Sequence, residues 1–375
     1  MNLNEIRGKI DSIDSQLIEL ISERMECSRQ VAEYKKENGM AVFDPVREAA
    51  ILERVAERGG IHGDALKQIW ATLMEQSRVL QYPYVDSKAI RQFADAKDCA
   101  KVKVIACQGI DGAYSALVGR RLYPNAQILF FDSWAQVCEA VASDKAEFGI
   151  LPVENSWAGS VHEVYDLLIG GNFCIAQSAN VHIRHNLIGL HNSKPEQIKQ
   201  VVSHPQALRQ CGDFIDRYGV DPIESSNTAV AVKSVAESGR SDVAAIGSAD
   251  AARIYGLSVI ESAIASSSTN TTRFVAISKQ AQRSPDADKI STVFSAEHTA
   301  GSLYRILAHF ASTGMSLTKL ESRPIHNSSF EYRFYADLSG NLDDPKVAGV
   351  LATLSVELPE FLLLGNYPER TIELD

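Results

Sequence analysis

The spacing of apolar residues changes twice along the 375-residue chain, and this change constrains the fold more than any single motif. Residues 1–90 show helical spacing only, because apolar positions recur every three or four residues. Residues 101–280 alternate short apolar runs with helical stretches, which is typical of an α/β domain. Residues 288–370 follow the order strand, helix, strand, strand, helix, strand. The sequence therefore predicts three domains joined by polar segments at 85–101 and 278–289.

The overall composition narrows the classes of function. The net charge is −10, which gives no support to nucleic-acid binding. Six scattered cysteines without a CxxC pair argue against a disulfide framework and a zinc knuckle. The sequence has no metal-ligand spacing, dinucleotide fingerprint or P-loop, so we expect neither a metal nor a cofactor. It also has no apolar run of the ~18 residues that a membrane span needs and no signal-peptide pattern, so we expect a reduced, cytoplasmic protein.

The helical segment has charged and polar residues where its apolar repeat predicts leucine. In the first helix, apolar residues recur at alternating intervals of four and three residues, and the next position of this repeat is Arg24. Lys35 lies eleven residues later on nearly the same face of the helix. In the third helix, predicted to begin near Asp64, Ser77 and Gln81 interrupt an apolar stripe in the same way. Because buried unpaired charge is costly, this set predicts a polar pocket for an anion. Paired polar groups that fix the register of a bundle are the structural alternative.

Arg7 indicates that the pocket needs a second copy of the chain. It precedes Arg24 by seventeen residues and points about 100° away from that face, so it cannot easily join the same pocket from the same helix. A second copy packed antiparallel could supply it. Three helices also form a thin core alone. Both facts favour a dimer.

A second helix is predicted to begin at Asp44, because an aspartate cap followed by Pro45 is a strong start signal. Arg47 and Glu48 follow in its first turn. The segment resembles the all-helical chorismate mutase family over residues 3–82, and the positions that match its active site are Arg7, Arg24, Lys35, Asp44, Arg47, Glu48, Ser77 and Gln81. This resemblance implies a helical dimer in which each site borrows an arginine from the other chain.

The chemistry implied by this resemblance needs no nucleophile and no cofactor. Conversion of chorismate to prephenate is an intramolecular rearrangement, so the protein need only hold a compact conformer and stabilise developing charge. The arginines would bind the two carboxylates by paired hydrogen bonds. Lys35 and Gln81 would donate to the ether oxygen as the catalytic pair, and Glu48 would accept from the substrate hydroxyl.

In the α/β segment, glycines and polar side chains follow several predicted strands. We expect short parallel strands with crossover helices, whose carboxyl ends are the usual place for a ligand. The residues at these ends are Gln108, Gly109, Gly112, Tyr114, Ser115, Glu154, Asn155, Ser156, Ser203, His204, Gln206, Ser226, Asn227 and Thr228. Taken singly, they are ordinary turn and capping residues. Together they suggest a cleft lined with neutral donors.

The stretch "NTTRF" (270–274) begins a predicted strand after a serine-rich segment. With "GIDGAYS", "PVENS" and "SHPQAL", it makes residues 101–280 closely resemble prephenate dehydratase. The resemblance implies two α/β lobes around a cleft, as in periplasmic-binding-protein-like folds, and the loss of carbon dioxide and water from prephenate to give phenylpyruvate. It ties Thr272 to catalysis.

A threonine hydroxyl is a poor acid, so we assign Thr272 as an oriented donor to the leaving hydroxyl group. The substrate-binding residues expected from the resemblance are Asn155, Ser203, Gln206, Ser226, Thr228 and Arg273. Two roles stay open: Arg273 either orients its loop or attracts the dianion, and Glu154 shares proton transfer or does not.

Residues 288–370 have the βαββαβ order of ferredoxin-like domains. They resemble the ACT regulatory domain through "GSL" and "ESRP", the motifs that bind phenylalanine between paired domains; the residues concerned are Gly301, Ser302, Leu303, Glu321, Ser322, Arg323 and Pro324. Ala300 stands where that family usually has proline, which leaves the affinity for phenylalanine open. A domain that only dimerises is the alternative.

The whole sequence therefore resembles a bifunctional chorismate mutase–prephenate dehydratase, inhibited by phenylalanine and assembled as a homodimer or a higher homo-oligomer. Two alternatives remain. One is a dehydratase with a non-catalytic, dimerising mutase-like arm, and the other is a two-lobed binding protein or sensor for an aromatic acid. The sequence decides neither between prephenate and arogenate as substrate, nor between dimer and tetramer, nor whether prephenate is channelled between sites.

Overall fold

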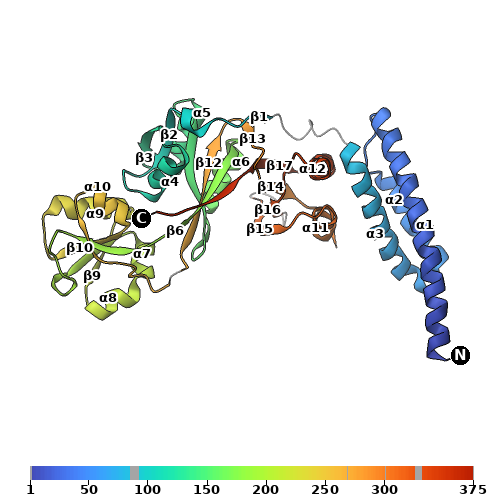
Figure 1. The fold of residues 1–375 in the computed structure, drawn as a ribbon, viewed down its shortest axis with the longest axis horizontal. Helices are drawn as coiled ribbons and strands as arrows, with labels where there is room; N and C mark the ends of the chain where they lie inside the picture. Colours follow the sequence, from blue (N-terminus) through green and yellow to red (C-terminus); the bar gives the residue numbers. More distant parts are fainter. Residues whose placement is uncertain (1, 85–92, 268, 300, 326–331, 375) are drawn as a thin grey trace. The chain divides into compact units, whose positions relative to one another are not determined.

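The structure is a computed structural model that describes residues 2–84, 93–267, 269–299, 301–325 and 332–374. Its contacts divide the chain into two compact units. The first holds Met1–Gln92 and Pro285–Asn366, and the second holds Phe93–Ser284 and Tyr367–Asp375. Within the described residues, no helix combines the length and apolar character that crossing a membrane requires. The elements are labelled in Figure 1.

Three helices form the N-terminal domain of the first unit. They are α1 (Leu3–Glu37), α2 (Pro45–Gly59) and α3 (Gly63–Gln81), with short 3-10 turns η1 (Gly60–His62) and η2 (Tyr82–Tyr84). The predicted start of α2 is confirmed, since the Asp44 side chain accepts from the Arg47 N–H at 3.0 Å. The tight turn into α3 requires Gly63, because a Cβ there would lie 2.3 Å from the carbonyl oxygen of Ala56.

Half of α1 has an apolar face that the protomer leaves exposed. The residues of the predicted repeat are 42–62% exposed; they are Ile6, Ile10, Ile13, Leu17 and Leu20. Ala32, near the other end, is the one buried residue of this fully described helix. The first half of α1 therefore finds no apolar partner within the described part of its own protomer.

The second unit has two α/β lobes (Figure 1). The first lobe has a seven-stranded sheet in the order β18-β6-β12-β4-β2-β3, with β5 paired to β4. Its elements are β2 (Val104–Gln108), α4 (Tyr114–Leu122), β3 (Gln127–Phe131), α5 (Trp134–Ala142), β4 (Phe148–Asn155), β5 (Gly159–Ser160), α6 (His162–Gly170), β6 (Cys174–His182), β12 (Thr271–Ser278) and β18 (Glu369–Ile372). A short parallel pair, β1 (Phe93–Asp95) with β13 (Ala281–Arg283), lies outside this sheet.

The second lobe has a five-stranded sheet in the order β11-β7-β10-β8-β9. Its elements are β7 (Asn186–Gly189), β8 (Gln200–Ser203), α7 (Pro205–Gln210), α8 (Gly212–Tyr218), β9 (Asp221–Glu224), α9 (Thr228–Ser238), β10 (Val243–Gly247), α10 (Ala249–Ile254) and β11 (Ser258–Glu261). Each face of this sheet has its own apolar cluster, one with Val201 and Phe214 and one with Val232 and Val235.

The expectation of parallel strands throughout is wrong for the strands that join the lobes. β2 is parallel to β3 and β4, but β12 is antiparallel to both β4 and β6. The chain leaves the first lobe after β6 and returns through β12, and Thr271 pairs with His182 where the two strands meet. A strand that returns from the same end of the sheet must run antiparallel to its neighbour. Both connections between the lobes therefore pass close to Thr272.

Strand β18 has no counterpart among the elements predicted from the sequence. Residues 369–372 leave the C-terminal domain and add a parallel edge strand to β6 of the first lobe. The Ser178 N–H also donates to the Pro368 carbonyl at 3.1 Å. A four-residue strand with three polar side chains has too little apolar pattern to be predicted from sequence.

The C-terminal domain has the predicted order of elements. They are β14 (Lys289–Ser295), α11 (Ser302–Ser312), β15 (Leu317–Pro324), β16 (Tyr332–Ser339), α12 (Pro345–Glu357) and β17 (Phe361–Tyr367). The sheet order is β15-β16-β14-β17, with β15 at one edge. Phe294, Phe310 and Leu351 are fully buried in its core. Ala300 lies outside the described residues.

Two candidate active sites

A cavity of about 230 Å³ lies between the two lobes of the second unit. It is lined by the ends of β2, β4 and β12 from the first lobe and by the first residues of α7 and α9 from the second. The described residues that line it include amides, hydroxyls and two histidines but no Lys, Arg, Asp or Glu. Burial lowers the pKa of both His185 and His204, which favours neutral rings. The cleft is therefore polar but nearly uncharged.

Asn155 fixes the direction of the Thr272 hydroxyl. The Asn155 side-chain oxygen accepts from the backbone N–H groups of Trp157 at 3.1 Å and Ala158 at 2.9 Å, which assigns the other atom as nitrogen. That nitrogen donates to Thr272 Oγ1 at 2.9 Å and to the Asn270 side-chain oxygen at 2.7 Å. Because Thr272 Oγ1 accepts this hydrogen bond, its own proton remains available to a ligand in the cleft.

A chain of buried amides continues from Asn270 to His185. Asn270 donates to Gln210 Oε1 at 3.0 Å, and His185 Nε2 lies 2.7 Å from the same oxygen. Since an amide oxygen only accepts, His185 Nε2 carries its proton and Nδ1 is left as an acceptor. Within the described part of the chain, His185 Nδ1 and Gln210 Nε2 are buried without a hydrogen-bond partner. Both residues line the cleft, so they offer one acceptor and one donor to a ligand.

The cleft contains some of the predicted substrate-binding residues and not others. Asn155, Gln206 and Thr228 line it together with Thr272. Ser203 does not: it is fully buried, and its hydroxyl donates to the Ile246 carbonyl of the neighbouring strand at 2.7 Å. Ser226 is likewise not among the residues that line the cavity. Ser203 ends β8 as expected, and Ser226 lies in the loop between β9 and α9, but side-chain direction at such positions cannot be deduced from spacing alone.

Arg273 is directed away from the cleft, which corrects its place among the substrate-binding residues. It follows Thr272 in a strand, so its side chain points to the opposite face of the sheet. There it is 7% exposed, donates to the Tyr367 hydroxyl at 2.6 Å and lies 3.2 Å from Glu369. Glu154 lies 3.9 Å from the same guanidinium. Of the two roles left open for Arg273, this geometry favours orientation, since it ties the C-terminal segment to β12.

Sequence reasoning missed His185 and Gln210, and it left Asn270 without a role although Asn270 begins the 270–274 motif. None of the three follows a glycine or a strand end in a recognisable pattern. Only the pairing of β6 with β12 and the docking of α7 bring these side chains together.

One glycine of the cleft is required by the approach of the two lobes. Gly112 has φ +85°, and a Cβ there would lie 3.2 Å from that of Ala251 in the second lobe. The glycines at 109 and 112 thus let the loop before α4 lie close to the other lobe. The N-termini of α4 and α9 both meet this cleft, and helix N-termini favour anions.

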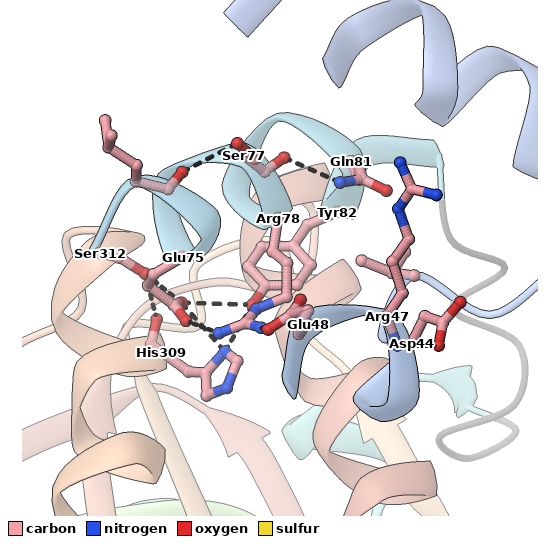
Figure 2. Close-up of polar contacts among 12 residues, drawn as sticks. Asp44, Arg47, Glu48, Glu75, Ser77, Arg78, Gln81, Tyr82, His309 and Ser312 are labelled. Carbon is pink, nitrogen blue, oxygen red and sulfur yellow. Dashed lines mark hydrogen bonds and ion pairs between the residues drawn. The ribbon is translucent and has the colours of Figure 1, made fainter. Parts of the chain in front are cut away.

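The helical domain brings most of its predicted site residues together on α1, α2 and α3. Arg24 donates to Ser77 Oγ at 2.6 Å, and Gln81 donates to the Ser77 carbonyl at 3.1 Å. The side-chain oxygen of Gln81 is buried without a partner among the described residues. Lys35 donates to the Val42 carbonyl at 2.5 Å. Figure 2 shows Ser77 and Gln81 on α3 with Arg47 and Glu48 on α2.

Charges in this pocket differ sharply from those in the cleft. Burial lowers the pKa of Lys35, and the nearby carboxylates of Asp44 and Glu48 oppose that shift. Glu48 lies 2.5 Å from Arg78, a cation that sequence reasoning missed because it directly follows Ser77 and does not interrupt the apolar stripe. Arg7 lies about 25 Å along α1 from Arg24, so it cannot reach its own protomer's pocket.

The two motifs that resemble those of ACT domains lie at a helix start and on an edge strand. Gly301 adopts a left-handed φ of +78° before α11, and the Ser302 hydroxyl donates to the Glu297 carbonyl at 2.6 Å. Arg323 in β15 is paired with Glu321 at 2.8 Å. Leu303 follows Ser302 in α11, and Ser322 and Pro324 complete the second motif in β15.

Family models and relatives agree on the two reactions. The model for chorismate mutase type II matches residues 6–82, and the model for prephenate dehydratase matches residues 105–282. A bifunctional chorismate mutase/prephenate dehydratase from Stutzerimonas stutzeri is 28% identical over 99% of this chain and 98% of its own length. Arogenate dehydratase/prephenate dehydratase 1, chloroplastic, from Arabidopsis thaliana is 36% identical over 72% of this chain and 73% of its own.

Two solved structures match the same part of the chain. Prephenate dehydratase from Arthrobacter aurescens, in complex with L-Phe, is 28% identical with a TM-score of 0.64 and matches 71% of this chain and 90% of its own. GqqA, described as a quorum quenching acylase, is 32% identical with a TM-score of 0.65 and matches 71% of this chain and 98% of its own. The two family models, the full-length relatives and the two sites together show that this chain belongs to the bifunctional chorismate mutase–prephenate dehydratases and has both activities.

Proposed function

We propose that Thr272 is the hydrogen-bond donor to the leaving hydroxyl group of prephenate. The observation that carries this role is the Asn155 amide, which donates to Thr272 Oγ1 at 2.9 Å and leaves the hydroxyl proton for the substrate. In the reaction the bond between the ring and its carboxylate breaks, and its electron pair enters the ring. The hydroxyl group leaves while hydrogen-bonded to Thr272 and takes one proton from solvent to become water, and carbon dioxide departs. A fixed donor lowers the barrier where negative charge grows on the leaving oxygen.

A nearly uncharged cleft suits this decarboxylation. An ion pair to the departing carboxylate would be lost as the group becomes neutral carbon dioxide, so it would stabilise the substrate more than the transition state. Neutral donors such as Gln206, Gln210 and Thr228, with the N-termini of α4 and α9, hold the carboxylates without that penalty. Aromatisation of the ring supplies the driving force.

The same lining favours prephenate over arogenate. Arogenate has an ammonium where prephenate has a keto oxygen, and a buried ammonium needs a carboxylate or several acceptors. No carboxylate is among the described residues that line the cleft. We therefore expect kcat/KM for prephenate to exceed that for arogenate by at least about tenfold, measured as phenylpyruvate or phenylalanine released from each substrate. Equal values would contradict this preference.

We also propose that the mutase pocket is completed by a second protomer. The exposed apolar face of α1 is continuous over residues 6–20, and Arg7 lies beside it, so a second α1 packed antiparallel would bury that face and bring its arginine toward Arg24. In the completed pocket Lys35 and Gln81 donate to the ether oxygen, Arg24, Arg47 and the partner's arginine bind the carboxylates, and Glu48 accepts from the hydroxyl.

We propose that residues 288–370 form an ACT domain that senses phenylalanine. The βαββαβ order supports this role, as do the left-handed Gly301 before α11 and an open edge at β15 where a second domain can pair. The related prephenate dehydratase from Arthrobacter aurescens was solved with L-Phe, which is also consistent with this role. Phenylalanine bound between paired domains would then inhibit the dehydratase.

The likeness to an acylase does not change this assignment. Amide hydrolysis by a threonine requires a nucleophile activated by a neighbouring base. In the described part of the cleft Thr272 Oγ1 accepts from an amide donor instead and makes no hydrogen bond to a base. This arrangement suits a hydroxyl that donates and does not suit one that attacks.

One assay tests the whole proposal. The full chain is given chorismate alone, and prephenate and phenylpyruvate are followed with time, with and without 1 mM phenylalanine. We expect prephenate first, phenylpyruvate second, and slower phenylpyruvate release with phenylalanine present. Unchanged release, with no shift in hydrodynamic size or thermal midpoint, would support a C-terminal domain that only dimerises.

A further inference from the structure

A buried polar cluster joins α3 of the helical domain to α11 of the C-terminal domain (Figure 2). Glu75 on α3 lies at its centre and is only 8% exposed. One of its oxygens lies 3.1 Å from His309 Nδ1 and accepts from the Ser312 hydroxyl at 3.2 Å. The Tyr82 hydroxyl lies 2.5 Å from the same His309 nitrogen. Both domains therefore supply polar contacts to the one buried carboxylate of Glu75.

The cluster continues from Glu75 into the mutase pocket. The other oxygen of Glu75 is paired with Arg78 three residues later on α3, and the opposite arm of Arg78 lies 2.5 Å from Glu48 on α2. One guanidinium thus holds two carboxylates at once, in the forked geometry that arginine provides. Glu48 is the residue proposed above to accept from the substrate hydroxyl. Its position depends on Arg78, and that of Arg78 depends on Glu75.

Close packing holds the two domains together around this cluster. α12 meets the turn after α3 so closely that a Cβ at Gly349 would lie 2.0 Å from the Tyr82 carbonyl oxygen. Glu357 at the end of α12 also faces the cluster, where burial raises its pKa to about 7 against the opposing effect of His309 and Arg78. His309 itself is 5% exposed. These contacts leave little room for the cluster to rearrange independently of α11.

A single helix connects this cluster with the phenylalanine motif. α11 begins directly after Gly301 and ends at Ser312, so about 16 Å of helix separates the motif from the contacts with Glu75. A short helix transmits a shift of one end to the other because its backbone hydrogen bonds resist bending.

We propose that His309 is a positioning residue for the mutase reaction, which acts through Glu75 and Arg78 to fix the Glu48 carboxylate and so makes mutase turnover depend on the position of helix α11. The inference rests on the proposed role of Glu48. Without His309, Glu75 is a buried carboxylate with one donor fewer. It then draws Arg78 toward itself, and Glu48 loses the partner that fixes it for the substrate hydroxyl.

The test uses the full chain and measures both reactions separately. His309→Ala should lower mutase kcat about 5–10-fold with little change in KM for chorismate, because orientation rather than binding is lost. Turnover of supplied prephenate should remain within about twofold of the unchanged protein and so reports an intact fold. His309→Gln, whose amide still donates to Glu75, should recover most of the lost kcat. Tyr304→Ala, at a position of α11 that is 74% exposed, is the matched control and should change neither activity.

A double-mutant cycle gives a second, independent criterion. In an Arg78→Met background the connection to Glu48 is already cut, so His309→Ala should cause no further loss of mutase kcat. Additive losses would overturn the inference, as would an unchanged mutase kcat in His309→Ala. Equal losses in the Ala and Gln variants, or a joint loss of both activities with a lowered thermal midpoint, would mean a packing role and would also overturn it. Absence of mutase turnover in the unchanged protein would instead contradict the proposed function.

Discussion

The two candidate active sites, which we propose to bind closely related dianions, differ in the charge of their side chains. The proposed mutase site contains charged side chains, among them Arg24, Lys35 and Glu48, whereas the described lining of the dehydratase cleft has no Lys, Arg, Asp or Glu. The mutase reaction keeps both carboxylates, so cations that bind them in the substrate also bind them in the transition state. The dehydratase reaction converts one carboxylate to carbon dioxide, and a cation there would oppose the reaction. The charge of each site therefore follows the fate of the carboxylate.

The sites also differ in completeness. Both lobes of the dehydratase cleft come from one chain, and its hydrogen-bond network from Thr272 to His185 is closed within that chain. The mutase site, as proposed, takes its distant arginine from a second protomer, and the apolar face of the first half of α1 is exposed. Changes that separate protomers should therefore lower mutase activity and leave dehydratase activity unchanged.

The largest expected effect is at Thr272. Thr272→Val keeps the shape of the side chain and removes the donor, so dehydratase kcat should fall by about 10²–10⁴-fold while chorismate is still converted to prephenate. Phenylpyruvate release from supplied prephenate is the measurement. Thr271→Val, an adjacent hydroxyl that does not line the cleft, is the control. Dehydration at a normal rate in Thr272→Val would refute the role of this hydroxyl.

The second largest effect concerns the charge of the mutase pocket. Lys35→Ala should lower mutase kcat by about 10²–10³-fold and leave turnover of supplied prephenate unchanged, because the developing charge on the ether oxygen loses its cation. Lys36→Ala on the same turn of α1 is the control.

The pH dependence of mutase turnover is a second measurement that tests the role of Lys35. Burial lowers the pKa of Lys35, and only its protonated form is the required cation. Mutase kcat should therefore fall as pH rises through a pKa below the ordinary value of about 10.4 for lysine. A mutase rate that is insensitive to alkaline pH, or to the loss of Lys35, would leave the mutase-like domain as a dimerising arm.

The incompleteness of the mutase pocket can be tested by mixing two inactive variants. Arg7→Ala and Lys35→Ala should each be nearly inactive as mutases. In a mixed dimer one of the two pockets combines an intact Lys35 with an intact arginine from the other chain. With random pairing, half of the dimers are mixed and each has one of two pockets intact, so about a quarter of the mutase activity should return. No recovery in co-expressed, doubly tagged mixed dimers would contradict a shared site.

The smallest expected effect is on stability, at Glu357. Burial raises the pKa of this carboxyl to about 7 from the usual 4.5, so the folded state binds its proton more tightly than the unfolded state does. Stability is therefore lost as pH rises from 4.5 to 7 and stays lower above that. Glu357→Gln should raise the free energy of unfolding by about 2 kcal/mol at pH 8 and by almost nothing at pH 4. Denaturation monitored at both pH values measures this, with exposed Glu53→Gln as control.

A gain for Glu357→Gln that is equal at both pH values would show that the carboxyl does not titrate as its surroundings predict. The contrast in charge between the two sites would then be weaker, because the protonation of Glu357 beside the charged cluster would not change between pH 4 and pH 8.

Much of this protein was determined by local sequence. Apolar periodicity placed the three helices of the mutase domain, and the Asp44 and Pro45 pair fixed the start of α2 because capping acts between neighbours in the chain. Arg24, Ser77 and Gln81 were found as polar interruptions of apolar stripes, and Thr272 was found through the resemblance of its motif, at a strand start, to prephenate dehydratase. These signals are readable because each depends on residues close in sequence.

Only the tertiary structure decided which side chains meet. It turned Arg273 and Ser203 away from the cleft, because one follows Thr272 on the opposite face of a strand and the other bonds to the adjacent strand. It brought His185 and Gln210 beside Asn270, and His309 beside Glu75, from segments that lie far apart in the chain. Such pairs produce no periodic pattern in the sequence. The direction of a side chain at a strand end and the partner of a buried charge depend on packing between elements, and the spacing of residues does not predict that packing.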